Sequence, residues 1–534
     1  MKIISLLAEF AVRNAIGLMA VGFLSVAALT WGRSKLAVVG TLKGALTVLS
    51  VLWIGILMVL FVNHIRFPLF LDLMEGVVYQ HFQRAAEYQY IYPAPSPEYV
   101  PLAYNVLYYV VAVPFSWIFG ESISTLRLIS ILATLGIALT IFLVLRKETG
   151  SRWWGLLGAG LFAASYHAMD SYLDTAHSDS CFVLCSIAGS ALIHYRTTRS
   201  MRLLGLAILI ASFWFKQHGA LFAVGGVLFL TRDEGWRKSW PYWVLAGVMG
   251  PVTYLFLAPI LFGSHFHFFT YHVPSGWSQF GLRPLVRFAG FFAISYFWLS
   301  LASAGWFVEQ LWRNRGRVTI WQVQLVAAVA TALMGSLDPG CSFNVYIPLA
   351  TWIVLTGVWG FSQLAVKPTE IWKTAASFTL LVLSFSLIAY NPVHLLRPSR
   401  ADQTYREFVH LLDSLEGTVY APTLGQLPAG FEFYPAAHWV ALEDMVRGPQ
   451  KDTRNHPEIQ ELLAPLLNSE EPVYILENYP LIRFPFFEYL NDHFVLEEDY
   501  GDRFRALDVL PGRYSHGWPR YLYRLDANSL DNEK

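Results

Sequence analysis

The sequence predicts a polytopic α-helical membrane protein that carries a small α/β domain outside the bilayer at its C-terminal end. Hydrophobic residues make up 55% of the 534 positions and charged residues only 14%, whereas soluble domains contain about 25% charged residues. Long apolar stretches recur from Ala11 to Tyr390, and the composition after Asn391 becomes that of a soluble protein. We therefore divide the chain into a transmembrane domain, 1–391, and a C-terminal domain, 392–534. The net charge is zero, so no overall field favours a nucleic-acid partner.

Twelve apolar segments of the first domain are candidates to cross the membrane, since a spanning helix needs about 20 such residues. They lie at 11–31, 44–64, 123–145, 154–170, 180–195, 203–215, 218–231, 241–263, 286–311, 319–337, 345–366 and 373–391. The first lacks a small-residue cleavage site, which favours a retained span over a cleaved signal peptide. The pair around Lys216 is short for two full crossings. Short spans that end inside a protein-lined cavity place polar residues at membrane depth.

Basic clusters between these segments define the predicted topology. They are Arg33/Lys35/Lys43, Arg146/Lys147/Arg152, Arg196/Arg199/Arg202, Arg232/Arg237/Lys238, Arg313/Arg315/Arg317 and Lys367/Lys373. Basic loops lie in the cytoplasm, so an even number of crossings has to separate each pair of clusters. This condition holds if the aromatic-rich stretch 101–119, which contains Pro114, is an interfacial or re-entrant helix. Both termini then lie on the exoplasmic side, in a protein predicted to reside in the plasma (inner) membrane.

The C-terminal domain shows the mixed pattern of a small α/β fold. Strands are predicted at 418–421, 439–442, 473–476 and 521–524, and helices at 402–415, 457–467 and 484–493. A domain of about 140 residues is large enough to bury its own core. Its sequence shows no phosphate loop, nucleophile elbow or metal-ligand spacing. We therefore expect a structural or substrate-gating domain, placed as a lid over the membrane domain.

Two carboxylates, Asp72 and Glu75, follow the second span in the exoplasmic loop 65–122. Residues three apart on a helix share one face. Apolar neighbours at the membrane raise the proton affinity of a carboxylate, which suits it to act as a general base. The alternative is that this pair only caps an interfacial helix.

Further ionisable residues lie at membrane depth, where charges are costly and mostly functional. They are Asp170, Asp174, His177 and Asp179, between two short spans, and Lys216 with His218, in the turn of the short pair. Asp179 has an alternative role as the start of a helix. The cation Lys216 requires an anion, which is either one of these carboxylates or a phosphate.

Two later exoplasmic loops add candidates. The loop 264–285 contains His265, His267, His272, Trp277 and Arg283. This mixture suits a sugar or phosphate pocket, but it suits an interfacial aromatic belt equally well. Asp338 and Asn344 flank a Pro-Gly turn before the next span. The three cysteines, at 181, 185 and 341, provide no disulfide framework or metal site and are interpreted as buried apolar residues.

Several short motifs occur in a recognisable order. They are Glu75-Gly76, YVPLAY from Tyr99 to Tyr104, Phe119-Gly120-Glu121-Ser122 with Arg127-Leu128-Ile129-Ser130, Asp179, Lys216-Gln217-His218-Gly219, and Asn344 with Pro348. In order and topology they resemble the GT-C superfamily of membrane glycosyltransferases. The resemblance is strongest to its bacterial branch, which includes relatives of protein mannosyltransferases and the lipid A aminoarabinose transferases, and it covers residues 65–360.

The resemblance implies a GT-C-like fold and an inverting glycosyltransferase. Such an enzyme moves a sugar from a polyprenyl-phosphate donor to a lipid, glycan or protein acceptor at the exoplasmic face. It implies Glu75 as the base, with Asp72 as the alternative, and Asp179 as a residue that orients the acceptor or a metal. The candidate substrate-binding residues are Lys216, His218, Arg84, Tyr104, His177, His265, His267, Arg283 and Asn344. A divalent cation, Mg²⁺ or Mn²⁺, is left open as a cofactor.

The chain departs from the family pattern at two site positions. Many relatives have adjacent Asp and Glu before the glycine, whereas Met74 takes the place of the Asp here. His177 stands where relatives often have Arg, and the first span, 11–31, lies outside the usual core. Two other functions stay open. A flippase for a lipid-linked saccharide would show two similar halves with broken helices, and a non-catalytic subunit would only anchor the C-terminal domain.

Overall fold

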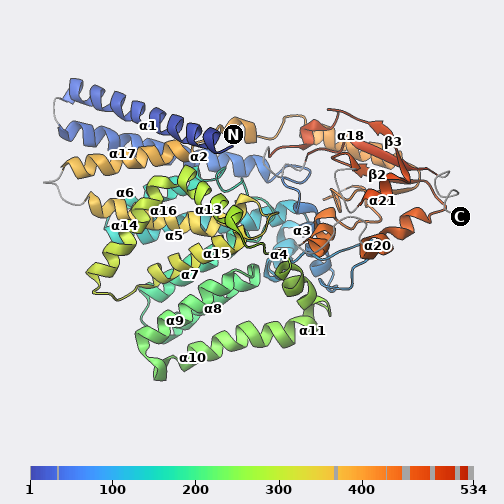
Figure 1. Cartoon of the computed structure of the whole chain (residues 1–534), viewed down its shortest axis with the longest axis horizontal. Coiled ribbons are helices and arrows are strands. Elements are labelled where there is room, and N and C mark those ends of the chain that lie inside the picture. The colour runs from blue at the N-terminus through green and yellow to red at the C-terminus, as the bar shows by residue number, and fades with distance from the viewer. Residues whose placement is uncertain are drawn as a thin grey trace.

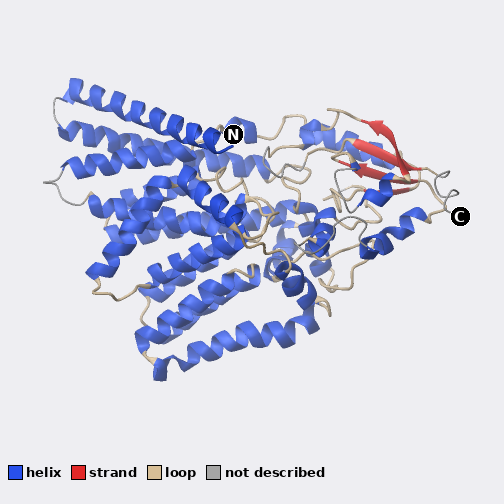
Figure 2. Ribbon diagram, in the orientation of Figure 1, coloured by secondary structure: helices blue, strands red, loops and turns tan. Residues whose placement is uncertain are grey.

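A helical body with a small sheet at one end makes up the fold (Figures 1 and 2). The computed structural model describes residues 2–526 apart from 33–34, 366–370, 429, 448–456, 482–486 and 511–516. Arg33 and Lys367 of the basic clusters lie outside the described residues. The helices of the body are α1 (Lys2–Gly32), α2 (Lys35–His64), α3 (Glu75–Ala86), α4 (Leu107–Phe119), α5 (Ile123–Thr149), α6 (Arg152–Ala164), α7 (Asp179–Tyr195), α8 (Arg199–Phe215), α9 (Gly219–Glu234), α10 (Trp236–Gly247), η1 (Val248–Leu257), α11 (Ala258–Phe262), η2 (Phe268–His272), α12 (Val273–Ser275), α13 (Leu282–Ser295), α14 (Phe297–Arg313), α15 (Ile320–Ser336), η3 (Phe343–Tyr346), α16 (Ile347–Leu364) and α17 (Ile371–Ile388).

Helices occupy each segment predicted to cross the membrane, but they differ in length. Six described helical segments are long and apolar enough to cross, or seven if the bent pair α13–α14 counts as one span. The other predicted crossings fall on α6, α7, α8, α9 and α15, which have 13 to 17 residues. The polytopic helical architecture is therefore confirmed, whereas the number of twelve crossings stays a prediction.

One predicted span is broken in two. The sequence predicts a single helix over 286–311, but α13 and α14 meet at an angle of 99°. Tyr296 leaves the helical conformation between them, with φ −126° and ψ 21°. Its buried ring packs against Phe291 and Phe292. An aromatic residue is no recognised helix breaker, so the apolar pattern gives no sign of this bend.

Helix α16 forms the axis of the body. In the apolar window of η3 and α16, 94% of the residues are buried, compared with 11% in that of α1 and 6% in that of the stretch from α10 to α11. Trp352 of α16 is fully buried, as are Trp306 of α14 and Trp321 of α15. The peripheral stretch from α10 to α11 packs mainly against α9 and α8 and forms an edge of the body (Figure 1). This edge provides one wall of the cavity described below.

The apolar stretch 101–119 contains a helix only from Leu107 onward. Helix α4 has 13 residues with Pro114 inside, which is too short to cross the hydrocarbon core. Trp117 and Ile118 near its end are 72% and 77% exposed. These features agree with a helix that does not cross, and its interfacial position stays a prediction.

The predicted topology places the turn between α5 and α6 in the cytoplasm. In a background without native cysteines, we expect Glu148→Cys to react with a membrane-impermeant maleimide only from the cytoplasmic side. Tyr88→Cys is the exoplasmic control, because Tyr88 lies in the loop after α3 and is 83% exposed. Labelling of position 148 from outside would instead make 101–119 a crossing span.

The C-terminal domain contains a mixed sheet whose described strands run in the order β1-β2-β4-β3. Its elements are α18 (Ala401–Asp413), β1 (Thr418–Tyr420), α19 (Trp439–Val446), α20 (Pro457–Leu467), β2 (Val473–Glu477), α21 (Glu488–Asn491), β3 (Phe494–Asp499) and β4 (Tyr521–Leu525). Strand β1 pairs parallel with β2, and β4 pairs antiparallel with both β2 and β3. The small α/β architecture is confirmed, and the domain boundary at 391 stays a prediction.

Two strand assignments in this domain are wrong. The stretch 439–442 is helical, because the His438 ring accepts the N–H of Val440 at 3.2 Å and starts α19. A short apolar run does not distinguish a strand from a helix. Strand β3 is missing from the prediction, because its acidic residues are uncommon in strands. Of the helix predicted at 484–493, α21 is the described helical part, and 484–486 lie outside the described residues.

The C-terminal domain packs on α3 and on the loop that follows it. The backbone N–H groups of Ala436 and Ala437 both donate to the Pro97 carbonyl, at 3.0 and 2.9 Å. At Gly76 an added Cβ would overlap the Leu424 carbonyl oxygen, so the close approach of the two segments requires glycine. These contacts fasten the domain to the loop 65–122, predicted to be exoplasmic, which carries the candidate carboxylates.

Candidate active site

Asp179, Lys216 and Asn344 converge from three separate segments. Asp179 is the first residue of α7, Lys216 follows α8, and Asn344 lies in η3. The Lys216 Nζ lies 2.6 Å from Asp179 Oδ1, and the Asn344 amide donates to Asp179 Oδ2 at 3.4 Å. All three residues are more than nine-tenths buried. Asp179 therefore begins a helix and also holds a buried cation.

His177 lies between two carboxylates. Its Nε2 is 3.4 Å from Asp72 Oδ2, and its Nδ1 is 3.8 Å from Asp179 Oδ2. Burial lowers the pKa of His177, but Asp72 and, next, Asp179 raise it, and the net result is a raised pKa. The charged imidazolium is thus favoured beside the two carboxylates. We call Asp72, His177, Asp179 and Lys216 the charged chain.

Glu75 lies apart from Asp72, in a buried ion pair with Arg127. Arg127 Nη2 is 2.5 Å from Glu75 Oε2, and its Nε donates to Oε1 at 3.1 Å. The same carboxylate accepts the backbone N–H groups of Leu71 and Ala176, both at 2.7 Å. Both oxygens are therefore engaged. The prediction of a shared helix face is wrong, because Asp72 precedes α3 whereas Glu75 begins it.

Arg127 also holds the backbone that leads to Asp72. Its Nη1 donates to the carbonyls of His64 and Phe67, at 3.2 and 2.8 Å, and its Nη2 donates to that of Leu69 at 2.6 Å. The guanidinium thereby joins α5 to the loop after α2. The ion pair fixes this loop next to the segment before α7, where His177 lies.

Asp174 makes a separate buried pair with His64. The His64 Nδ1 lies 2.8 Å from one oxygen of Asp174, and the Tyr166 hydroxyl donates to the other at 2.7 Å. The His64 Nε2 lies 2.6 Å from the Leu395 carbonyl. This group joins α2 to the segment that leads into the C-terminal domain, which is a structural task.

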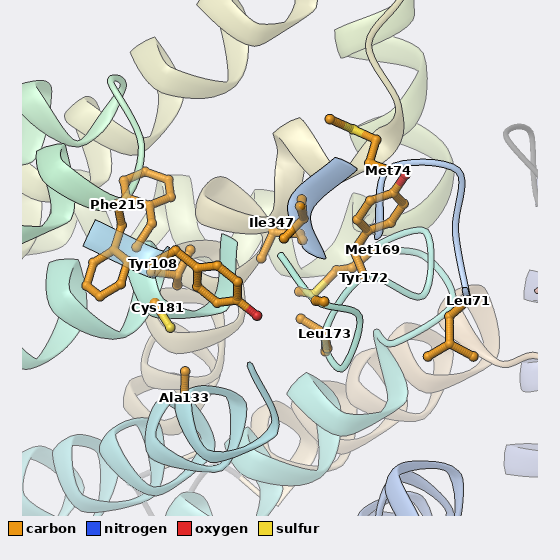
Figure 3. Packing of buried hydrophobic residues seen from close by; sticks show 14 of the residues in the cluster. Leu71, Met74, Tyr108, Ala133, Met169, Tyr172, Leu173, Cys181, Phe215 and Ile347 are labelled. Atoms are coloured by element: carbon orange, nitrogen blue, oxygen red, sulfur yellow. The ribbon is translucent and has the colours of Figure 1, made fainter. Parts of the chain in front are cut away.

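A cavity of about 930 Å³ opens beside the charged chain. The predicted site residues that line it are Tyr104, Lys216, His218 and Asn344. The Lys216 Nζ lies 5.5 Å from the centre of the Tyr104 ring. Met74, two residues after Asp72, lines the cavity together with Tyr172, and Figure 3 shows these two side chains close together.

One wall of the cavity is apolar and lies between α9 and the stretch of α10 and η1. Its residues are Val224, Val227, Trp243, Ala246, Gly247, Gly250, Pro251 and Leu255. Val224 and Leu255 are 55% and 51% exposed, so this wall continues onto the surface that a membrane protein presents to lipid. Added Cβ atoms at Gly247 and Gly250 would meet nothing within 4 Å, which leaves the wall smooth and open.

The end of α19 closes the cavity from the C-terminal domain. Arg447 Nη2 lies 2.8 Å from Asp444 Oδ1 and 3.3 Å from Asp338 Oδ2. The guanidinium lies 4.3 Å from the centre of the Trp277 ring, and the Trp277 Nε1 donates to the Asp444 carbonyl at 3.0 Å. Together with Glu443, these residues line the cavity. We call Trp277, Asp338, Glu443, Asp444 and Arg447 the roof cluster.

Two carboxyl groups of the roof cluster, those of Glu443 and Asp444, have a raised pKa. Burial raises the pKa of Asp444 to about 7, and although Arg447 opposes this shift, Glu443 and Asp338 reinforce it. Burial also raises the pKa of Glu443. Near neutral pH the Asp444 carboxyl group therefore serves both as a donor and as an acceptor of hydrogen bonds.

Five predicted substrate-binding residues do not line the cavity. They are His177, which belongs to the charged chain, and Arg84, His265, His267 and Arg283. Arg84 donates to the Tyr90 carbonyl at 2.7 Å and stacks 4.7 Å over the Tyr99 ring. His267 lies 3.0 Å from the Tyr254 carbonyl, and Arg283 is exposed. A substrate role for these residues stays a prediction.

The sequence prediction missed the contribution of α19. Glu443 and Asp444 precede Arg447 by four and three residues, which is the spacing of ion pairs on a helix. This signal conflicts with the strand predicted at 439–442 and would have corrected it. No local pattern reveals that the arginine also reaches Asp338, more than a hundred residues away.

The donor set of the charged chain does not fit a divalent cation. Both oxygens of Asp179 already accept from Lys216 and Asn344, so a metal would have to displace an ammonium group. Within the described residues, no group of three or more His, Cys, Asp or Glu side chains is arranged to hold a metal ion.

Solved structures share this fold. ArnT from Cupriavidus metallidurans in the apo state matches 90% of this chain and 98% of its own, with a TM-score of 0.50 and 14% sequence identity. ArnT from the same organism bound to undecaprenyl phosphate matches with the same coverage, a TM-score of 0.46 and 15% identity. Neither a protein-family model nor a curated protein matches the sequence. The GT-C-like fold implied by the motif order is thus confirmed, and the likeness concerns the fold alone.

Proposed function

We propose that this GT-C-like chain is an inverting glycosyltransferase that moves a sugar from a polyprenyl-phosphate donor to a lipid, glycan or protein acceptor at the exoplasmic face. The observation that carries the proposal is one cavity with an apolar, outward-facing wall and a buried ammonium group, that of Lys216. A polyprenyl phosphate has the same two parts, an apolar chain and an anionic head. The cavity therefore matches this donor in chemistry.

The Lys216 ammonium group binds the donor phosphate. An ammonium group has three N–H donors, and Asp179 accepts from it at 2.6 Å without using all of them. The imidazolium group of His177 adds a second positive charge to the charged chain. In a buried site such charges are weakly screened, so they stabilise the negative charge that develops on the departing phosphate.

Asp72 acts as the general base. The oxygens of Glu75 are engaged by Arg127 and by two backbone N–H groups, whereas Asp72 faces the titratable His177. The acceptor hydroxyl attacks the anomeric carbon on the side opposite the phosphate. The new carbon–oxygen bond forms as the bond to the phosphate oxygen breaks, and Asp72 takes the hydroxyl proton. The anomeric configuration is inverted.

Removal of the Lys216 charge is expected to weaken donor binding. We expect Lys216→Met to bind polyprenyl phosphate in nanodiscs about 10- to 100-fold more weakly, the effect of losing a charged hydrogen bond. Lys147→Met is a matched control, because Lys147 also lies over an aromatic ring, 3.7 Å from that of Tyr195, but at the predicted cytoplasmic end. Equal affinities for wild type and Lys216→Met would contradict the phosphate site.

A further inference from the structure

The roof cluster lines the part of the cavity that a lipid phosphate bound to Lys216 would leave unoccupied. Tyr104 connects this cluster with Lys216. Its ring lies 5.5 Å from the Lys216 Nζ, and the residue lines the same cavity as Asp444 and Arg447. The apolar wall, the ammonium group and the roof cluster therefore belong to one continuous space, with residues from both parts of the chain.

Two buried polar groups near the roof cluster lack a hydrogen-bond partner within the described part of the chain. They are the hydroxyl of Ser342, a residue only 8% exposed that lines the cavity, and the Nε of Arg447. A buried donor or acceptor without a partner is costly. Such groups in the wall of a cavity indicate that a polar ligand completes their hydrogen bonds.

We propose that the roof cluster is the sugar subsite and that it recognises the hydroxyl groups of a neutral sugar on the lipid-linked donor. This inference rests on the proposed function. The donor consists of a chain, a phosphate and a sugar in that order, and the cavity offers an apolar wall, Lys216 and the roof cluster. Carboxyl groups accept from sugar hydroxyls, and the guanidinium of Arg447 donates to them. Pockets of this kind combine apolar walls with a few placed polar groups.

The charge of the roof cluster also selects against acidic sugars. It holds three carboxyl groups and one guanidinium group, and Arg447 already lies within 3.3 Å of both Asp338 and Asp444. A sugar that carries a carboxylate would face the Asp338 carboxylate without a free cation, because Arg447 is already paired, and like charges in a buried site repel strongly. The class of substrate is therefore a neutral hexose or pentose rather than a uronic acid.

The test compares two kinds of probe lipid on the same protein in nanodiscs. One probe is polyprenyl phosphate without a sugar, and the others are polyprenyl phosphates that carry a neutral hexose, a neutral pentose or a uronic acid. Wild type is expected to bind at least one neutral sugar lipid about tenfold more tightly than the bare phosphate, the effect of one or two hydrogen bonds. It is expected to bind the uronic acid lipid no more tightly than the bare phosphate.

The variants Asp444→Asn and Arg447→Lys are expected to lose this preference while they bind the bare phosphate as wild type does. Unchanged affinity for the bare phosphate shows that they are folded. Asp499→Asn is the matched control, because Asp499 pairs with Arg520 on the exposed edge of the same domain, at 2.7 Å, away from the cavity. Lys216→Met is expected to weaken the binding of both kinds of lipid equally.

The possible results separate the two proposals. If wild type binds neither kind of lipid, the proposed function fails and the sugar subsite fails with it. If wild type prefers a sugar lipid and both roof variants keep that preference, the sugar subsite alone is overturned. The same conclusion follows if the roof variants lose as much affinity for the bare phosphate as for the sugar lipid. It also follows if wild type binds the uronic acid lipid most tightly.

Discussion

The substitution Asp72→Asn is expected to slow sugar transfer by about 10²- to 10⁴-fold, the usual contribution of a general base. The side chain keeps its size, and its oxygen still accepts the Met74 N–H, which lies 2.6 Å from the Asp72 carboxylate. An amide cannot take the proton of the acceptor hydroxyl. Donor binding should be unchanged, because the phosphate is held by Lys216. Single-turnover release of bare polyprenyl phosphate from a labelled donor measures the rate.

Asp402→Asn is the control for Asp72→Asn. Asp402 is half exposed and pairs with Arg397 in the C-terminal domain, so the loss of its charge should leave the transfer rate as in wild type. A wild-type transfer rate in Asp72→Asn would show that Asp72 is not the base. Reduced donor affinity with an unchanged rate would assign Asp72 to binding instead.

The substitution Glu75→Gln is expected to destabilise the protein by about 3 to 5 kcal/mol, the effect of breaking a buried ion pair by removing one partner. Arg127 would keep its charge in a site where neither side chain is exposed. The loop that carries Asp72 depends on this guanidinium, so transfer should fall as well. Thermal unfolding in detergent, monitored together with transfer, measures both effects.

The double variant Glu75→Gln/Arg127→Gln separates positioning from catalysis. It leaves no buried charge without a partner, so it should be more stable than Glu75→Gln alone and should regain part of the transfer activity. If Glu75 is the base, the double variant stays inactive although it is folded. A Glu75→Gln protein with wild-type stability and no transfer would likewise indicate that Glu75 is the base, as the family resemblance implies.

The sequence predicted most of the membrane fold because the signals that govern it are local. A run of about 20 apolar residues and flanking basic clusters are both visible in one window. The bend at Tyr296 was invisible, because its cause is the packing of that ring on Phe291 and Phe292. Similarly, the acidic strand β3 pairs with the edge of β4, and no local pattern of the sequence reveals this pairing.

The sequence indicated which residues belong to the candidate site better than it indicated which of them contact one another. Unusual charges at membrane depth identified Asp179 and Lys216, and the structure brings these two within 2.6 Å. The sequence also identified Asp72 and Glu75, but it could not show that Arg127 forms an ion pair with Glu75. Such pairing depends on how α5 meets the loop after α2, which is a property of the tertiary fold. The contact between Arg447 and Asp338 in the roof cluster was hidden for the same reason.

The most direct test of the central claim is a transfer assay with wild-type protein in proteoliposomes. The probes are polyprenyl phosphates that carry a labelled neutral sugar, offered with an acceptor lipid on the exoplasmic side. The proposed function predicts that bare polyprenyl phosphate and glycosylated acceptor appear in equal amounts, with the anomeric configuration inverted. No consumption of any donor, or passage of the intact sugar lipid across the membrane without cleavage of its sugar–phosphate bond, would contradict it.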